Sequence, residues 1–149
     1  DKRLVVIGDG PDYKKIKALA PSNVTLLGFA ETAVLRDHMQ RASAFIFPPE
    51  EDFGIIPLEA QAAGTPVIAY ARGGALETIN GLDTERPTGV FFHMQNESSI
   101  IDAIQRFEAN RDKIKSGYCR ENAERFNVKR FDREFKDFIE SLLKERGVV

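Results

Sequence analysis

Two glutamates on either side of a glycine are the residues in this sequence whose types and spacing could do chemistry. Glu51 and Glu59 are separated by seven residues, and Gly54 lies between them. Glu51 is expected on a loop after an apolar run, and Glu59 in the first turn of the next helix. Gly54 permits a close approach of the backbone to a ligand, and a helix N-terminus offers N–H groups to a phosphate. A carboxylate there could accept the paired hydroxyls of a ribose. The segment therefore suits a polyhydroxylated, phosphate-bearing ligand.

The same residues also have a simpler interpretation. Acidic side chains are common at helix starts because they interact favourably with the helix macrodipole. Glu50, Glu51 and Asp52 would equally suit a solvated loop. The spacing of two carboxylates is a weak signal by itself, so the ligand site has to be argued from the whole segment and its neighbours.

The elements around this segment follow an alternating pattern. Apolar runs predict strands over residues 4–7, 24–27, 44–47, 66–70 and 89–92, and helical patterns between them predict helices over 12–20, 31–41 and 56–63, with a helical turn ending at Glu77 and two or three further helices after the last strand. Strands joined by helices at this spacing predict an α/β fold with a doubly wound, Rossmann-like parallel sheet. Ligands of such sheets bind at the carboxyl ends of the strands, where these loops begin.

Composition excludes several classes of function. The net charge is −2 and both signs are spread along the chain, which argues against a nucleic-acid partner. No apolar run approaches the roughly 20 residues that a transmembrane helix needs. Cys119 is the only cysteine, so an intrachain disulfide and a thiolate metal cluster are both excluded. We expect a single cytoplasmic domain over residues 1–149.

A dinucleotide-binding oxidoreductase is a rival interpretation of the first turn. Gly8-Asp9-Gly10 follows a predicted strand, but Tyr13 stands where that fingerprint needs a third glycine or alanine. No acidic residue follows the second strand at the expected distance. His38 and His93 have no acidic partners at ligand spacing and are expected as a helix residue and a strand-end residue. The sequence therefore favours neither a dinucleotide nor a metal.

The longest motif supplies a specific resemblance. Residues 51–69, with Gly73-Gly74-Ala75-Leu76-Glu77 after them, resemble the signature of the retaining GT-B glycosyltransferases of family four, also called group 1 glycosyl transferases. Val6-Ile7-Gly8-Asp9-Gly10-Pro11 and residues 24–29 look like further landmarks of that family, in the expected order. The resemblance covers essentially the whole chain. It implies the nucleotide-sugar-binding, C-terminal domain of such an enzyme.

The resemblance also implies a role for each matching residue of the central segment. Glu51 would contact hydroxyls of the transferred sugar near the reaction centre and is the candidate catalytic residue. Glu59 would bind the ribose hydroxyls, and Ile56 would lie against the nucleoside or the phosphate. Backbone amides would hold sugar hydroxyls and the distal phosphate, at Phe53, Gly54 and Ile55.

Earlier residues would complete the donor site that the resemblance implies. Phe29 and Ala30 would receive the base, largely through backbone groups, and Gly8 would lie near the phosphates. The family needs no metal, so we expect none and no cofactor beyond the donor substrate. The family's Arg and Lys that neutralise the diphosphate would lie upstream of residue 4, and Lys14 and Lys15 are poor substitutes for them. We therefore expect a fragment that lacks the first βα unit and the N-terminal acceptor domain, and that is inactive alone.

The implied activity is hexose transfer from a nucleoside diphosphate sugar to an acceptor hydroxyl with retention of configuration. GDP-mannose is the favoured donor, and polysaccharide or glycoconjugate assembly the favoured setting. A glycan or lipid-linked acceptor would be held by the missing domain, which leaves peripheral association with the inner face of a membrane open. Gln61 stands where the family often has methionine, a change not expected to affect the chemistry. The alternative is a non-catalytic nucleotide-sugar or protein-binding module of the same fold.

The C-terminal segment carries an amphipathic stripe. Phe131, Phe135, Phe138 and Leu142 recur at the spacing of one helix face. We expect this helix to pack mainly on its own domain. Family members also direct it back toward the N-terminal domain, so any exposed part of the stripe would promote self-association.

Overall fold

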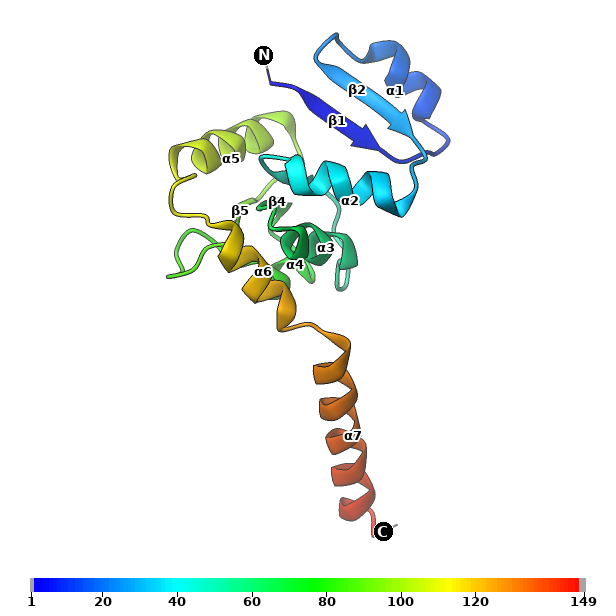
Figure 1. Cartoon of the computed structure of the whole chain (residues 1–149), viewed down its shortest axis with the longest axis vertical. Coiled ribbons are helices and arrows are strands. Elements are labelled where there is room, and N and C mark those ends of the chain that lie inside the picture. Colours follow the sequence, from blue (N-terminus) through cyan, green and yellow to red (C-terminus); the bar gives the residue numbers. More distant parts are fainter. Residues whose placement is uncertain (1, 148–149) are drawn as a thin grey trace. The chain divides into compact units, whose positions relative to one another are not determined.

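The computed structural model describes residues 2–147, and its internal contacts divide the chain into two compact units. The boundary falls between Met39 and Gln40. Figure 1 shows the elements of both units, which are described in turn. The expectation that residues 1–149 form one domain stays a prediction.

Unit 1 is built on a pair of parallel strands. Strand β1 (Leu4–Ile7) pairs with β2 (Val24–Gly28), with a register irregularity before Ile7. Helix α1 (Tyr13–Leu19) connects them, and helix α2 (Thr32–Arg41) follows β2 and crosses the unit boundary. A parallel connection through a helix is what alternating apolar runs predict.

Unit 2 contains a three-stranded parallel sheet in the order β3-β4-β5. Its strands are β3 (Phe45–Phe47), β4 (Val67–Tyr70) and β5 (Gly89–Phe92). Its helices are α3 (Ile55–Ala63), α4 (Ala75–Thr78), α5 (Glu97–Ala109), α6 (Ser116–Glu124) and α7 (Val128–Glu145). The predicted α/β, Rossmann-like fold is therefore confirmed in its parallel strands and connecting helices.

Helices cover both faces of the unit 2 sheet. Ile68 of β4 belongs to a core cluster with Phe92 of β5 and Phe107 of α5. Successive side chains of a strand point to opposite faces, so Val67 and Ala69, both fully buried, point away from that cluster. Helix α3 contacts β3 and β4, while α5 contacts β4 and β5 (Figure 1). Strand β4 is therefore covered on both faces.

Two helix ends differ in how their backbone groups are satisfied. Gly64 ends α3 in the left-handed region (φ 92°), and its N–H donates to the carbonyls of the last helical turn. Asp12 holds the position before α1, but its side chain makes no capping hydrogen bond. Asp12 therefore holds the N-cap position without the side-chain hydrogen bond that stabilises a helix start.

Helix α7 corrects one expectation from the sequence. It carries the predicted stripe, but none of its side chains is buried, and Phe131, Phe135 and Phe138 are each more than half exposed. Phe131 and Phe135 stack on each other with ring centroids 5.6 Å apart. The expected packing of this stripe on its own domain is wrong, because its three phenylalanines are exposed. The ring contact between Phe131 and Phe135 is an i,i+4 contact within the helix.

Candidate donor site

A shallow pocket lies at the carboxyl end of β3, on the loop that leads into α3. Its lining is continuous in sequence: Glu50, Glu51, Asp52, Phe53, Gly54, Ile55 and Ile56. The strand stops at Pro48 because proline cannot donate to a sheet ladder, and the chain turns into α3 at Gly54. The structure therefore brings together the residues that the sequence predicts for the sugar and the distal phosphate. Their roles toward a ligand stay predictions.

The N-terminus of α3 faces this pocket without a side-chain cap. Gly54 adopts φ 81° and ψ 77°, a left-handed conformation that favours glycine, and no side chain bonds the helix start. Pro57, the third helical residue, has no N–H to satisfy. The first N–H groups of a helix lack intrahelical partners, so the amides of Ile55 and Ile56 are positioned to bind an anion.

Glu59 lies further along α3 than the sequence predicts. Helix α3 begins at Ile55, one residue early, and its first turn contains no acidic side chain. Glu59 is thus the fifth helical residue, exposed, and one turn beyond Ile55 on the same face. The prediction of Glu59 in the first turn is wrong. The macrodipole acts mainly within the first turn, so this position also weakens the simple capping interpretation of Glu59.

The loop after β4 packs directly against the Glu51 loop. The N–H of Gly74 donates to the carbonyl of Glu51 at 2.8 Å. A Cβ at Gly73 would lie 2.2 Å from that same carbonyl oxygen, and one at Gly74 would lie 2.4 Å from the carbonyl oxygen of Phe53. Both positions need glycine because the backbone of the neighbouring loop fills the space of a side chain.

The remaining predicted site residues belong to unit 1. Gly8 follows β1 in an open position, and its N–H donates to the carbonyl of Gly28 at 2.8 Å. Phe29 is exposed and Ala30 half-buried just after β2. Each of the three therefore lies at the carboxyl end of a parallel strand, as predicted. Their contacts with a nucleotide stay predictions.

A second shallow pocket in unit 1 follows β1. It is lined by Asp9, Gly10, Pro11, Tyr13, Lys14 and Gly28. The Tyr13 hydroxyl donates to the carbonyl of Leu26 at 3.4 Å, and the ring lies against Gly28. Tyr13 therefore occupies the helix–strand contact that a dinucleotide fingerprint reserves for a small residue. The structure agrees with the sequence in disfavouring that rival interpretation.

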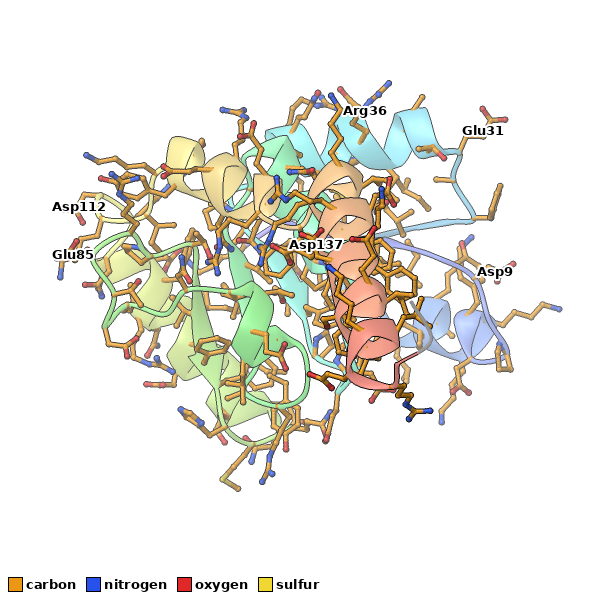
Figure 2. All side chains as sticks on the ribbon, turned by 90° about the horizontal axis from the view of Figure 1, so that it is seen from below. Asp9, Glu31, Arg36, Glu85, Asp112 and Asp137 are labelled. Carbon is orange, nitrogen blue, oxygen red and sulfur yellow. The ribbon has the colours of Figure 1, made fainter. Side chains whose placement is uncertain are left out.

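Charged groups away from the pockets are solvated. Figure 2 shows Glu85 and Asp112 at the periphery of unit 2, and both side chains are exposed. Among residues 2–147, no three His, Cys, Asp or Glu side chains gather where they could hold a metal ion. In the same described part of the chain, no helix combines the length and apolar character needed to cross a membrane.

Cys119 is a structural residue of the core. Its side chain is fully buried, and Sγ lies 3.8 Å from the carbonyl oxygen of Thr88. Burial raises the pKa of this thiol to about 11, against a smaller opposing effect of the Arg120 charge. His38 is half-buried on α2, and His93 is exposed immediately after β5. His38 and His93 thus lie on a helix and at a strand end, as predicted.

A buried polar cluster that the sequence does not predict joins α3, α4 and α6. Gln61, Thr78 and Asn122 are almost fully buried and hydrogen-bond one another across α3, α4 and α6. Gln61 gave a usable signal, because an amide in the otherwise apolar face of a short helix needs a buried partner. Asn122 gave none, since it lies in a polar helix sequence.

Comparison with known proteins places these features in a family. Residues 1–126 match the family described as glycosyl transferases group 1. A GDP-mannose-dependent alpha-(1-6)-phosphatidylinositol monomannoside mannosyltransferase of Mycobacterium tuberculosis is 32% identical over 123 residues, which is 74% of this chain and 31% of that protein. The alpha-1,3/1,6-mannosyltransferase ALG2 of Candida albicans is 39% identical over 80 residues, 50% of this chain and 18% of that protein. The chain thus spans less than a third of either relative.

A solved structure supports the fold over nearly the whole chain. The sucrose-phosphate synthase of Thermosynechococcus elongatus superposes with a TM-score of 0.77 at 25% identity, over 96% of this chain and 39% of that one. The family match reaches from β1 to the end of α6 and so includes both pockets. This chain belongs to the group 1 glycosyl transferases.

Proposed function

We propose that this chain binds the donor in a retaining hexosyltransferase that moves a sugar, mannose by preference, from a nucleoside diphosphate to an acceptor hydroxyl. One observation carries the proposal. The pocket of residues 50–56 is lined by the acidic residues Glu50, Glu51 and Asp52 and by the first residues of α3, whose start is uncapped. A donor of this class presents the same two chemistries, hydroxyls and a diphosphate.

The helix start suits the leaving group. Negative charge develops on the distal phosphate as its oxygen separates from C1 of the sugar. The amides of Ile55 and Ile56, at the positive end of α3, would stabilise that charge most in the transition state. In a same-face attack, the acceptor oxygen bonds to C1 and its proton passes to the departing phosphate oxygen. Protons and charge then balance without a metal or another cofactor.

The two glutamates would act at different parts of the donor. Glu51 lines the pocket and would accept hydrogen bonds from hydroxyls of the transferred sugar. Glu59 lies one turn further along α3 and would accept those of the ribose. Ile56, which is 43% exposed, offers an apolar surface between them for the nucleoside. The donor would therefore lie along α3.

The preference for mannose rests on relatives. The mycobacterial and Candida proteins are both named mannosyltransferases, and the former name specifies GDP-mannose and a phosphatidylinositol acceptor. By extension, the whole protein would act in polysaccharide or glycoconjugate assembly in the cytoplasm, at the inner face of a membrane when the acceptor is lipid-linked. Acceptor choice would belong to a part of the enzyme outside these residues.

A donor screen on the full-length protein tests the proposal. Purified enzyme would be assayed with GDP-mannose, UDP-glucose and ADP-glucose, and the anomeric configuration of the product read by NMR. Glu51→Ala should lower kcat about 10- to 100-fold, the value of one or two hydrogen bonds to a charged group. Glu59→Ala should mainly raise the donor KM. Glu85→Ala is the matched control, because Glu85 is an exposed glutamate that lines neither pocket.

The outcomes separate the proposal from its alternative. Wild-type turnover in both Glu51→Ala and Glu59→Ala would refute the site assignment. An inverted product would refute retention while leaving the donor site intact. Failure of the full-length protein to bind any nucleoside diphosphate would instead favour a non-catalytic module of the same fold.

A further inference from the structure

The buried polar cluster of unit 2 joins three helices through side-chain amides. Asn122 of α6 donates from Nδ2 to Oε1 of Gln61 on α3 and to the carbonyl of Thr78 on α4, each at 2.8 Å. Gln61 donates from Nε2 to the same Thr78 carbonyl at 2.8 Å. The exposed fraction of Gln61 and Thr78 is 0%, and that of Asn122 is 4%. Two buried amides thus converge on one carbonyl at the end of α4.

A chain of short contacts runs from this cluster to the donor pocket. Oγ1 of Thr78 donates to the carbonyl of Gly74 at 2.9 Å. The N–H of Gly74 donates in turn to the carbonyl of Glu51 at 2.8 Å. Gly73 and Gly74 already touch the backbone of Glu51 and Phe53 closely enough to exclude a Cβ. A movement of α4 is therefore transmitted directly to the Glu51 loop.

Helix α4 is too short to hold its own position. It has four residues, whereas isolated helices below roughly 12 residues are marginal in water. Hydrogen bonds constrain distance and angle more narrowly than apolar contact does. Removing both amides would also leave the buried carbonyl of Thr78 without its two side-chain donors, at a cost of about 1–3 kcal/mol. What the amides of Gln61 and Asn122 add is a defined position for α4.

A second set of contacts connects the α6 segment with the same region. The ring of Phe126, two residues beyond α6, meets the ring of Phe53 edge-on with centroids 5.9 Å apart. Arg120 donates to the carbonyl of Ala63 at the end of α3, at 3.2 Å. Residues 116–126 therefore support the pocket loop of residues 50–54 both through α4 and directly at Phe53.

We infer that Asn122, acting with Gln61, is a positioning residue for sugar transfer. It touches no part of the pocket lining. Its amide holds the carbonyl of Thr78, and the Thr78 hydroxyl holds the carbonyl of Gly74. Through its N–H, Gly74 then sets the position of the Glu51 carbonyl, and with it the sugar-binding side of the pocket. The consequence for catalysis rests on the proposed function. The mechanical coupling between Asn122 and the Glu51 carbonyl does not depend on that function.

Isosteric variants of the full-length enzyme test the inference. Asn122→Leu removes one amide, and the double variant Gln61→Met with Asn122→Leu removes both, while each new side chain is similar in size to the one it replaces. We expect kcat for sugar transfer to fall at least about tenfold, because a shift of an ångström in the reacting geometry costs up to 100-fold. The Kd of the free nucleoside diphosphate should stay within twofold, because the amides at the start of α3 are unchanged.

Ile114→Ala is the control for a merely structural effect. Ile114 is buried in the core cluster of the sheet face covered by α5, and its apolar side chain makes none of the hydrogen bonds of the chain described above. Assayed well below every melting temperature, it should keep wild-type kcat even where its melting temperature falls as far as that of Asn122→Leu. A parallel loss of kcat in Ile114→Ala and Asn122→Leu would overturn the inference.

Amide hydrogen exchange supplies a readout that does not depend on catalysis. In Asn122→Leu, peptides covering residues 50–54 and 73–78 should lose protection while those covering α5 keep it. Unchanged exchange in those peptides would overturn the inference, whatever the activity. Faster exchange in a protein that transfers no sugar would uphold the coupling and show that the proposed function is the part at fault.

Discussion

Adding one methyl group at Gly74 tests how closely the loop after β4 and the pocket loop of residues 50–54 depend on each other. In Gly74→Ala, the new Cβ would lie 2.4 Å from the carbonyl oxygen of Phe53 and 2.6 Å from that of Asp52. Ordinary contacts begin near 3.4 Å, so one loop must move by about 1.0 Å (3.4 − 2.4). The backbone conformation of Gly74 is right-handed helical, which alanine adopts without strain. The clash is therefore the whole perturbation.

The expected effect is larger on catalysis than on stability. Overpacking of a buried site costs about 1–3 kcal/mol, whereas an ångström of misplacement can lower a rate about 100-fold. We expect Gly74→Ala in the full-length enzyme to remain folded and to lose about 10- to 100-fold in kcat. Steady-state kinetics with the preferred donor and a thermal melt measure the two quantities separately.

Gly117→Ala is the matched control for this change. A Cβ at Gly117 would meet nothing within 4 Å, and the residue lies in α6, where alanine is up to about 1 kcal/mol more favourable than glycine. Its melting temperature should stay level or rise, with kcat unchanged. Wild-type kcat in Gly74→Ala would refute the argument that the loop after β4 sets the position of the Glu51 loop.

Further predictions concern the core and the helix ends. Cys119 should resist iodoacetamide at pH 8 in the folded chain, because a thiol with a pKa of about 11 is protonated at that pH. In urea, where the thiol is no longer buried, it should react at once. Because the folded pKa of Cys119 exceeds the unfolded value of 9.0, its contribution to the free energy of unfolding is complete below pH 9 and is lost as pH rises toward 11. The free energy of unfolding, measured by urea titration, should fall by at most about 3 kcal/mol over this range. A Cys119→Ala chain should lack this decline. Asn96→Ala should cost about 1 kcal/mol and lower the melting temperature, because Oδ1 of Asn96 caps α5 by accepting from the N–H of Ser99 at 2.9 Å. Asp12→Ala, which removes no cap bond, should leave the melting temperature unchanged, and an equal loss in both variants would contradict the capping argument.

The sequence predicts the elements of the fold well because apolar periodicity and turn residues are local signals. Strand β5 has the predicted limits, and β4 starts one residue late because Pro66 cannot donate to the ladder. The start of α3 was predicted one residue late because left-handed Gly54 serves as its cap in place of a polar side chain. That shift alone moved Glu59 out of the first turn.

Other features of the site depend on contacts distant in sequence. Glu51 and Gly74 meet through a backbone hydrogen bond, and such bonds carry no mark in residue type. Asn122 lies 61 residues from Gln61, its hydrogen-bond partner. The stripe on α7 shows the reverse case. Periodicity predicts an apolar face correctly, but says nothing about which surface covers it.

The pocket loop of residues 50–54 follows a path set by main-chain contacts with Gly73 and Gly74, more than 20 residues later in the chain. Residues outside the loop therefore determine its backbone path. The side chains of Glu50, Glu51 and Asp52 line the pocket from a backbone that does not depend on them for its position. A designer could randomise those three positions in a library without rebuilding the scaffold. Natural divergence has the same freedom: these side chains can change by single substitutions while the architecture of the pocket is inherited intact.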